Sequence, residues 1–453
     1  MRSRIRAKFA GVLALSLVAG GLAAAVSGTH SASAASGNTN VVCTEGIVAG
    51  DGAKEFTLEA RDGYVEFPDG NTVYVWSYAP AGGAFQFPGP NLCVDQGDAV
   101  RVYYSNPADG LNIDGGIPAD LSSIAFPGQT GVSATGGQPG LITNEAVPVT
   151  DTVVYEFVAD NAGTYLYQSA TDPAVQIQMG MFGGLVVYPS AGREFAYSGH
   201  EFDPEYEYLL LFHEIDPALH VEVELAAWGA DDDAVLANYD PAVRHNRYWT
   251  INGRSFPDTI FPNGTPLMPN QPYGALVQIN ADDPTDGYNQ LPGLVRYGNA
   301  GLDNHPFHPH GDTLALIGRD GRVLPDEIEA YTETVAAGQT YDILAGWEDV
   351  EAWQGSGPPV GINVPSLQNL VFKDGVSFYS GAANLGQKQQ LPADVTSFSV
   401  CGEYYFPWHS HALQEIQNFD EGFGGMLTLW RVNPPKVETS PGSGVWIDPP
   451  ECG

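Results

Sequence analysis

Two short stretches, Asn304-His-Pro-Phe-His-Pro-His-Gly311 and Phe406-Pro-Trp-His-Ser-His411, decide how this sequence folds and what it can bind. The whole chain has 10 histidines, and these two stretches contain five of them. Each stretch includes a His-x-His pattern. On a β-strand, residues i and i+2 point to the same face, so each pattern places two imidazoles side by side.

The pattern pairs His308 with His310 and His409 with His411. Two such strands lying next to each other would bring four imidazoles into one small space. Imidazole sets of this kind bind copper, and zinc is the alternative metal. The competing interpretation is a group of hydrogen-bonded histidines at a domain interface.

The N-terminus has the composition of an export signal. Four basic residues precede an apolar run at residues 9–26, and Ala32-Ser-Ala34 follows as a cleavage motif. We therefore expect residues 1–34 to be a signal peptide and the mature protein to be secreted. No other apolar run in the sequence is long enough to cross a bilayer, so no membrane span is predicted.

The sequence is strongly acidic, with a formal net charge of −36 at pH 7. Removal of the signal would take away four basic and no acidic residues, which gives −36 − 4 = −40. Such a surface repels nucleic acid and anionic lipid, which excludes both as partners. It indicates attraction for cations or a salt-rich habitat, and equally a surface that keeps a secreted protein soluble.

Four cysteines lie in the exported part: Cys43, Cys93, Cys401 and Cys452. An oxidising compartment favours disulfides, and no Cys-x-x-Cys spacing suggests a zinc site. The sequence allows three pairings. Proximity along the chain favours Cys43 with Cys93 and Cys401 with Cys452.

Composition and turn signals predict an all-β protein of the sandwich kind. The chain has 54 Gly and 34 Pro, and its apolar or alternating runs are short. The 453 − 34 = 419 mature residues exceed one hydrophobic core, so two domains are expected. The first, residues 40–190, has predicted strands at residues 55–60, 72–78, 99–104, 152–158, 164–167 and 184–188.

The second domain is expected at residues 200–433, after a polar linker within residues 190–205. A short helix is predicted within residues 215–228. Residues 351–365 are expected to form a loop, and the Pro-rich tail at 434–453 to lie extended on the surface. Strands are predicted at residues 208–212, 248–251, 275–279, 293–297, 314–317, 331–335, 341–345, 401–406 and 426–432.

The two halves echo each other. Gly163-Thr-Tyr-Leu-Tyr-Gln-Ser-Ala170 corresponds loosely to Gly402-Glu-Tyr-Tyr-Phe-Pro-Trp-His-Ser-His411, and a Gly-rich apolar segment follows each. Internal similarity of this kind predicts two copies of one sandwich fold.

The histidine stretches resemble those of the cupredoxin-domain multicopper oxidases, especially the two-domain forms, with copper nitrite reductases as relatives. In that family a His-Pro-x-His-x-His-Gly strand is followed by a His-Cys-His strand near the C-terminus. The resemblance covers nearly the whole mature chain and includes framework pieces at residues 248–254, 295–301, 318–321 and 337–342. It implies two cupredoxin-like Greek-key β-sandwich domains, copper as cofactor, a small-molecule or metal-ion reductant as partner, and a homotrimer.

The sequence departs from this family at the blue copper centre. Ser410 stands where the family has its thiolate ligand, and a serine hydroxyl does not replace a thiolate on copper at neutral pH. Glu415 stands where another histidine completes the centre. Only His305 of that set remains, and strand alternation points Ser410 toward it and away from His409 and His411. No blue copper is expected, although His305 stays among the predicted metal ligands.

The first domain also lacks the family's histidines. Its ligand positions are held by Ser122, Pro127, Gln168, Ser169, Ala170 and Gln176. A trinuclear copper cluster needs histidines from both domain types, and this chain supplies only the second domain's share. The four remaining histidines are predicted to hold one metal ion, or two with help from nearby carboxylates, namely Asp303, Asp312, Glu415, Asp420 and Glu421.

Two hypotheses for function follow from these residues. The first, which we prefer, is a secreted copper-dependent oxidoreductase with a reduced four-histidine site. The second is a non-catalytic secreted binding or surface protein that keeps the cupredoxin scaffold without redox chemistry. Bound metal together with copper-dependent oxygen consumption would distinguish the first from the second.

Overall fold

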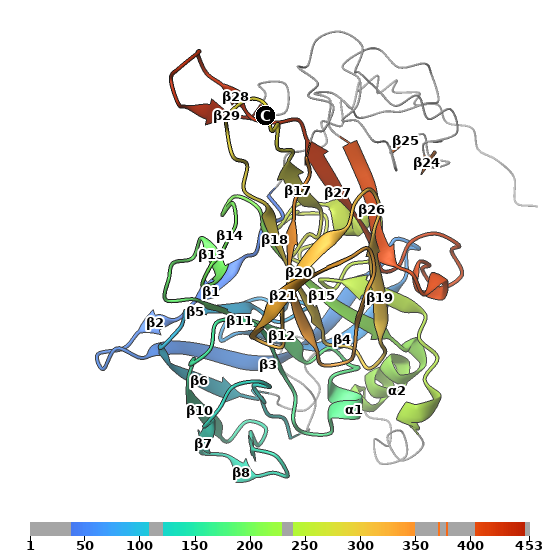
Figure 1. Cartoon of the computed structure of the whole chain (residues 1–453). Helices are drawn as coiled ribbons and strands as arrows, with labels where there is room; N and C mark the ends of the chain where they lie inside the picture. Colours follow the sequence, from blue (N-terminus) through green and yellow to red (C-terminus); the bar gives the residue numbers. More distant parts are fainter. Residues whose placement is uncertain are drawn as a thin grey trace, which may run out of the picture. The chain divides into compact units, whose positions relative to one another are not determined.

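The structure, a computed structural model, describes residues 38–107, 121–228, 239–348, 370–371, 377–378 and 404–448 (Figure 1). The predicted signal peptide, the loop at residues 351–365 and the predicted Cys401–Cys452 pair lie outside these residues. In the described part of the chain, no helix is both long and apolar enough to span a membrane.

Residues before the middle of the chain form two sheets, which we call the N-terminal sandwich. One sheet has the order β1-β5-β12-β11 and the other β2-β3-β6-β10-β7, with β4 paired to β3. The elements are β1 (Cys43–Glu45), β2 (Ile47–Val48), β3 (Lys54–Glu66), β4 (Thr72–Pro80), β5 (Asn91–Asp95), β6 (Ala99–Ser105), β7 (Ser133–Thr135), β8 (Gln138–Pro139), β9 (Asn144–Glu145), β10 (Thr152–Val158), β11 (Gly163–Gln168), α1 (Pro173–Gln176) and β12 (Phe182–Tyr188).

The remaining residues form the C-terminal sandwich, with sheets of order β16-β15-β18-β23-β20-β21 and β17-β27-β26-β19-β22. Its elements, with those that flank it, are β13 (Phe195–Tyr197), β14 (His200–Glu201), β15 (Glu207–Ile215), α2 (Pro217–Ala227), η1 (Pro241–Val243), β16 (Tyr248–Ile251), η2 (Asp258–Ile260), β17 (Val277–Asn280), β18 (Gly293–Asn299), β19 (His305–Pro309), β20 (Leu314–Arg319), β21 (Arg322–Ala330), β22 (Glu333–Val335), β23 (Thr340–Ala345), β24 (Leu370–Val371), β25 (Ser377–Phe378), β26 (Tyr404–Ser410), η3 (Leu413–Glu415), β27 (Leu427–Asn433), β28 (Val437–Glu438) and β29 (Trp446–Ile447).

The same pairings recur in both sandwiches, as the internal echo in the sequence predicts. β5 lies parallel to β12, which pairs antiparallel with β11. In the second copy β17 lies parallel to β27, which pairs antiparallel with β26. The other sheets repeat a second pattern, with β3 parallel to β6 and β15 parallel to β18. The prediction of an all-β fold of sandwich type is therefore confirmed.

Each sandwich encloses an apolar core, and a third core joins them. The first core includes Trp76 and Tyr155, and the second includes Trp408 and Trp430. The third combines side chains from both halves, among them Phe182 and residues of β15. Burial of such large apolar side chains is the main favourable term in folding, at about 25 cal/mol per Å². The shared core therefore makes the two sandwiches pack as one body.

A buried ion network reinforces this junction. Arg296 on β18 is fully buried, and its guanidinium donates to Glu207 at 2.7 Å and to Asp342 at 3.1 Å. Thr164 on β11 lies 3.1 Å from the same guanidinium, and Tyr188 on β12 donates to Glu207 at 3.0 Å. A buried arginine is tolerated only when carboxylates and hydrogen bonds compensate its lost hydration. These contacts tie strands of the two sandwiches together.

Most predicted elements are found, with small shifts at their ends. The predicted helix is α2, where the Asp216 carboxylate accepts from Ala218 N at 3.0 Å and Pro217 occupies the first turn. Both residue types are favoured at a helix start. β5 and β21 were not predicted. β21 is an exposed edge strand rich in charged residues, so it lacks the alternation by which half-buried strands are recognised.

Two segments differ from what the sequence suggests. The polar linker contains the hairpin of β13 and β14, whose Tyr197 is buried together with Phe202. The Pro-rich tail contains the small hairpin of β28 and β29. Near the N-terminus the predicted Cys43–Cys93 disulfide is present, with 5.4 Å between the Cα atoms.

Candidate metal centre

β19 and β26 carry the four histidines and pair directly. The strands are antiparallel, and His308 lies opposite His409. The ring centre of His308 is 4.9 Å from that of His310, 5.6 Å from that of His409 and 5.2 Å from that of His411. The ring of His409 lies 5.1 Å from His310 and 5.9 Å from His411. We call these four residues the four-histidine cluster.

Backbone carbonyls fix the tautomer of two rings in the cluster. His409 Nδ1 lies 2.7 Å from its neighbour's carbonyl oxygen, Ser410 O, and His308 Nδ1 contacts Tyr331 O. A carbonyl oxygen only accepts, so each Nδ1 carries the proton and each Nε2 keeps its lone pair. A ring N–H that donates to a backbone carbonyl is a common support for a metal-binding histidine.

Burial favours the neutral form of two rings in the cluster, His310 and His409. Burial, together with the neighbouring histidines, lowers the pKa of His310 to about 4. Burial also lowers the pKa of His409. Neutral imidazole is the form that binds metal ions.

The spacing of the cluster suits one ion, although its donors do not yet converge. In the described part of the chain, no group of three or more His, Cys, Asp or Glu side chains is arranged as a formed metal site. His310 Nε2 and His409 Nε2 are 3.1 Å apart. Two nitrogens bound to one ion at about 2 Å in tetrahedral geometry lie roughly 3.3 Å apart. The His310 and His409 nitrogens therefore lie close to the separation of two ligands on one ion.

Two of the carboxylates considered as extra ligands, Asp303 and Asp420, form ion pairs with arginines. Asp303 pairs with Arg244 and accepts from Asn246 at 2.7 Å. Asp420 pairs with Arg247 at 2.6 Å. These contacts give no support to a second metal ion.

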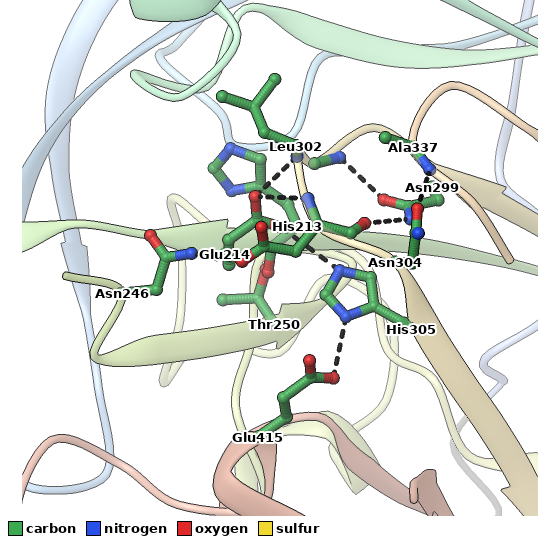
Figure 2. Close-up of polar contacts among 12 residues, drawn as sticks. His213, Glu214, Asn246, Thr250, Asn299, Leu302, Asn304, His305, Ala337 and Glu415 are labelled. Atoms are coloured by element: carbon green, nitrogen blue, oxygen red, sulfur yellow. Dashed lines mark hydrogen bonds and ion pairs between the residues drawn. The ribbon is translucent and has the colours of Figure 1, made fainter. Parts of the chain in front are cut away.

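His305, the fifth predicted ligand, lies on the opposite face of the strand and is enclosed by carboxylates (Figure 2). Its Nδ1 is 2.8 Å from Glu415 Oε2, and its Nε2 is 3.3 Å from Glu214 Oε2. The His305 and Glu214 side chains have no exposed surface, and that of Glu415 is 5% exposed. Both ring nitrogens point at acceptors, so the ring is a doubly protonated imidazolium and offers no lone pair. This geometry argues against His305 as a metal ligand.

The charges of this group, which we call the Glu–His–Glu bridge, stabilise one another. Burial alone would lower the pKa of His305, but the hydrogen bonds to Glu214 and Glu415 outweigh it and raise the pKa to about 9. Burial alone would raise the pKa of Glu214, but the hydrogen bond and charge of His305 lower it to about 2. His305 and Glu214 are thus both charged at neutral pH.

Ser410 joins the bridge on the inner face of β26. Its hydroxyl donates to Glu415 Oε2 at 2.5 Å. The residues aligned with the family's blue copper ligands, His305, Ser410 and Glu415, therefore do meet in space. They form hydrogen bonds and an ion pair where the family has a metal.

The corresponding positions of the N-terminal sandwich are also filled by hydrogen bonds. Ser169 donates to Gln176 Oε1 at 2.6 Å, and Gln176 Nε2 donates to Leu121 O at 2.8 Å. Ser122 and Tyr104 share a hydrogen bond of 2.6 Å between their hydroxyls. None of these side chains is a strong copper ligand.

Glu214 was missed in the sequence. It follows the apolar run of β15, and its carboxylate also accepts from Leu302 N at 2.6 Å and from Asp303 N at 3.1 Å. A charged residue at the end of a fully buried strand needs a partner. That rule indicates that Glu214 has a partner, but it does not say that the partner is His305, which lies 91 residues further along the chain.

Comparison with known proteins agrees with this fold. Residues 61–192 match the family model described as multicopper oxidase. The iron transport multicopper oxidase FET3 of Kluyveromyces lactis is 38% identical over 115 residues, which cover 25% of this chain and 16% of that protein. FET3 of Saccharomyces cerevisiae is 33% identical over 105 residues, 22% of this chain and 15% of that protein. The chain thus aligns with less than a fifth of the length of these relatives.

A solved structure resembles nearly the whole described chain. The blue copper oxidase of Nitrosomonas europaea superposes with a TM-score of 0.51 at 18% identity, over 83% of this chain and 85% of that chain. At this identity the likeness shows the fold. Residues 61–192 are thus similar to multicopper oxidases in sequence, and the chain as a whole shares the fold of the solved structure.

Proposed function

We propose that this protein is an exported copper-binding protein that holds one copper ion at the four-histidine cluster and acts as a copper-dependent oxidoreductase. Similarity to multicopper oxidases in residues 61–192 and to the FET3 proteins supports copper. The comparisons give no support to zinc, the alternative in the sequence. Export is supported by the basic start, apolar run and Ala-Ser-Ala motif of residues 1–34. The homotrimer stays a prediction from the family resemblance.

The observation that carries the proposal is the orientation of the rings. His308 and His409 each fix Nδ1–H on a backbone carbonyl, so the lone pair of each ring is on Nε2. His310 Nε2 already lies 3.1 Å from His409 Nε2. Copper held by imidazoles would supply one-electron transfer. The protein's part is to orient the ligands and to present the exposed His411 side of the cluster to a reductant.

The first test is a copper titration of the purified protein with a visible and an electron paramagnetic resonance spectrum. We expect one copper per chain, nitrogen ligation and no intense blue band. His308→Ala with His409→Ala should raise the copper Kd at least about 100-fold. A stoichiometry that the double variant leaves unchanged would overturn the proposal.

A second candidate is a non-catalytic copper-binding protein. It is favoured by the Glu–His–Glu bridge, which occupies the inner face of β26 and leaves one candidate metal position in the described part of the C-terminal sandwich. Complete reduction of oxygen to water requires four electrons, and one copper ion stores one.

Oxygen consumption decides between the two candidates. The reductants to test are phenols, Mn(II), Cu(I) and Fe(II), the last because both curated relatives are named iron transport oxidases. Consumption that depends on copper and stops with a chelator supports the oxidoreductase. Copper binding without turnover of any of these reductants supports the binding protein.

A further inference from the structure

The Glu–His–Glu bridge connects the parts of the fold that carry the four-histidine cluster. Glu214 lies on β15 of one sheet, His305 begins β19 of the other sheet, and Glu415 lies in η3, the turn after β26 (Figure 2). The bridge therefore spans both sheets of the C-terminal sandwich. It reaches both histidine-bearing strands from their inner side.

One end of the bridge is held rigidly by the backbone. The Glu214 carboxylate accepts from the amides of Leu302 and Asp303, just before β19. Gly301 precedes them, and a Cβ atom there would collide with the same carboxylate. Backbone amides that converge on a carboxylate fix its position more firmly than flexible side chains do.

The other end fixes the turn that follows His411. The Glu415 carboxylate accepts from the Ser410 hydroxyl, and the Ser410 Oγ atom accepts from Ala412 N at 3.2 Å. Ser410 N donates to Met426 O at 3.0 Å, and Met426 N donates to Glu415 O at 2.8 Å. The direction of the chain through His411 thus depends on the contacts of Glu415.

Backbone hydrogen bonds between β19 and β26 lie next to the bridge. His411 N donates to Pro306 O at 2.6 Å, and His310 N donates to Pro407 O at 2.9 Å. Pro306 follows His305 directly. A displacement of His305 relative to Glu415 would therefore change the spacing of the rings on the outer face.

We propose that Glu214, His305 and Glu415 are positioning residues, whose buried bridge holds β19 and the turn after β26 so that the four imidazoles stay grouped where one metal ion binds. The metal consequence rests on the proposed function; the strand positioning does not. Two carboxylates and one imidazolium also leave one net negative charge behind the cluster, and this charge favours a cation on the outer face.

The variants make one chemical change at three places. Glu415→Gln and Glu214→Gln remove a carboxylate charge from either end of the bridge while keeping its shape. Glu207→Gln is the matched control, because Glu207 is also a buried carboxylate that is paired with a cation, Arg296, on strands that do not carry the cluster. All three changes should lower stability, so a general loss of stability is controlled.

The first measurement is amide hydrogen exchange on the metal-free full-length protein. In Glu415→Gln we expect exchange at His310 N and His411 N to rise about tenfold, and Glu207→Gln should leave both rates within about twofold. Equal effects of the two variants, or no effect of Glu415→Gln, would overturn the positioning role. This result does not depend on whether the protein binds metal.

The second measurement is the Cu(II) Kd with the nitrogen coupling pattern in the paramagnetic resonance spectrum. Glu415→Gln should raise Kd about tenfold and alter the coupling, Glu214→Gln should raise it about threefold, and Glu207→Gln should leave both unchanged. If the unaltered protein binds no copper, the proposed function fails and the exchange result still decides the positioning role. If it binds copper and Glu415→Gln changes neither Kd nor coupling, the link from the bridge to the metal is wrong.

Discussion

The two faces of β26 differ in how their polar side chains are used: one joins a buried ion-pair network and the other carries the histidine cluster. On the inner face Ser410 is fully buried and joins an ionised network in which both nitrogens of His305 are engaged. On the outer face His409 and His411 lie beside His308 and His310, and the Nδ1 protons of His308 and His409 on backbone carbonyls leave the lone pair of each of these two rings on Nε2. A metal needs lone pairs, so the copper site that we propose lies on the outer face.

The difference shows how a metal position in this fold becomes a structural contact. A buried imidazolium between two carboxylates cross-links strands as a metal ion does, with a proton on each ring nitrogen in place of coordinate bonds. The N-terminal sandwich uses neutral hydrogen bonds for the same purpose, with Ser169 on Gln176. Charge in the C-terminal sandwich makes its inner face sensitive to mutation and to pH.

The largest expected effect on stability comes from removing the His305 imidazole. His305→Ala leaves two buried carboxylates without their shared cation, and loss of one partner of a buried ion pair costs about 3–5 kcal/mol. Urea unfolding at neutral pH measures this loss. The control His411→Ala, on the exposed outer position, should stay within about 0.5 kcal/mol. A loss below about 1 kcal/mol for His305→Ala would mean that the bridge is not a major contact.

The pH dependence of stability should follow the charges of the bridge. The pKa of His305 rises from 6.5 to about 9, so its contribution is complete below about pH 6.5 and is lost as the pH rises through about 9. This difference between the two pKa values corresponds to a loss of folding free energy on the order of 3 kcal/mol. The groups that face His305 are Glu214 on β15 and Glu415 in η3, and His213 lies beside Glu214.

Glu214 determines how stability changes on the acid side of the pH range. Its pKa falls from 4.5 to about 2, so its contribution is complete above about pH 4.5 and is lost as the pH falls through about 2. Urea midpoints between about pH 5 and pH 10 test the alkaline limb. His305→Gln should flatten it, and an equally steep alkaline loss in that variant would assign the effect to other groups.

The smallest expected effect on stability comes from removing one atom, the hydroxyl oxygen of Ser410. Ser410→Ala removes the hydroxyl that donates to Glu415 but keeps the ion pair with His305. We expect a loss of about 1–2 kcal/mol, the usual cost of depriving a buried acceptor of one donor. The same urea experiment measures it, with Ser443→Ala in the exposed tail as control. A gain in stability would show that the hydroxyl strains the turn.

Local patterns predicted much of this fold. The strands at residues 152–158 and 248–251 were located within their observed bounds because apolar or aromatic residues there recur at strand spacing. β21 escaped because an exposed edge strand has no buried face to mark it. For the site, the His-x-His spacing alone indicated that each pair of rings shares a face.

By itself, the sequence determined the all-β architecture, its internal duplication and the absence of a thiolate at position 410, since composition, spacing and residue identity are local properties. Only the tertiary structure decided that His305 is an ion-pair partner and that His308 and His409 each hold the Nδ1 proton on a backbone carbonyl. The role of a histidine depends on which acceptors face its two nitrogens. Those acceptors, Glu214, Glu415 and Tyr331, come from other strands and turns, and only folding brings them to the ring.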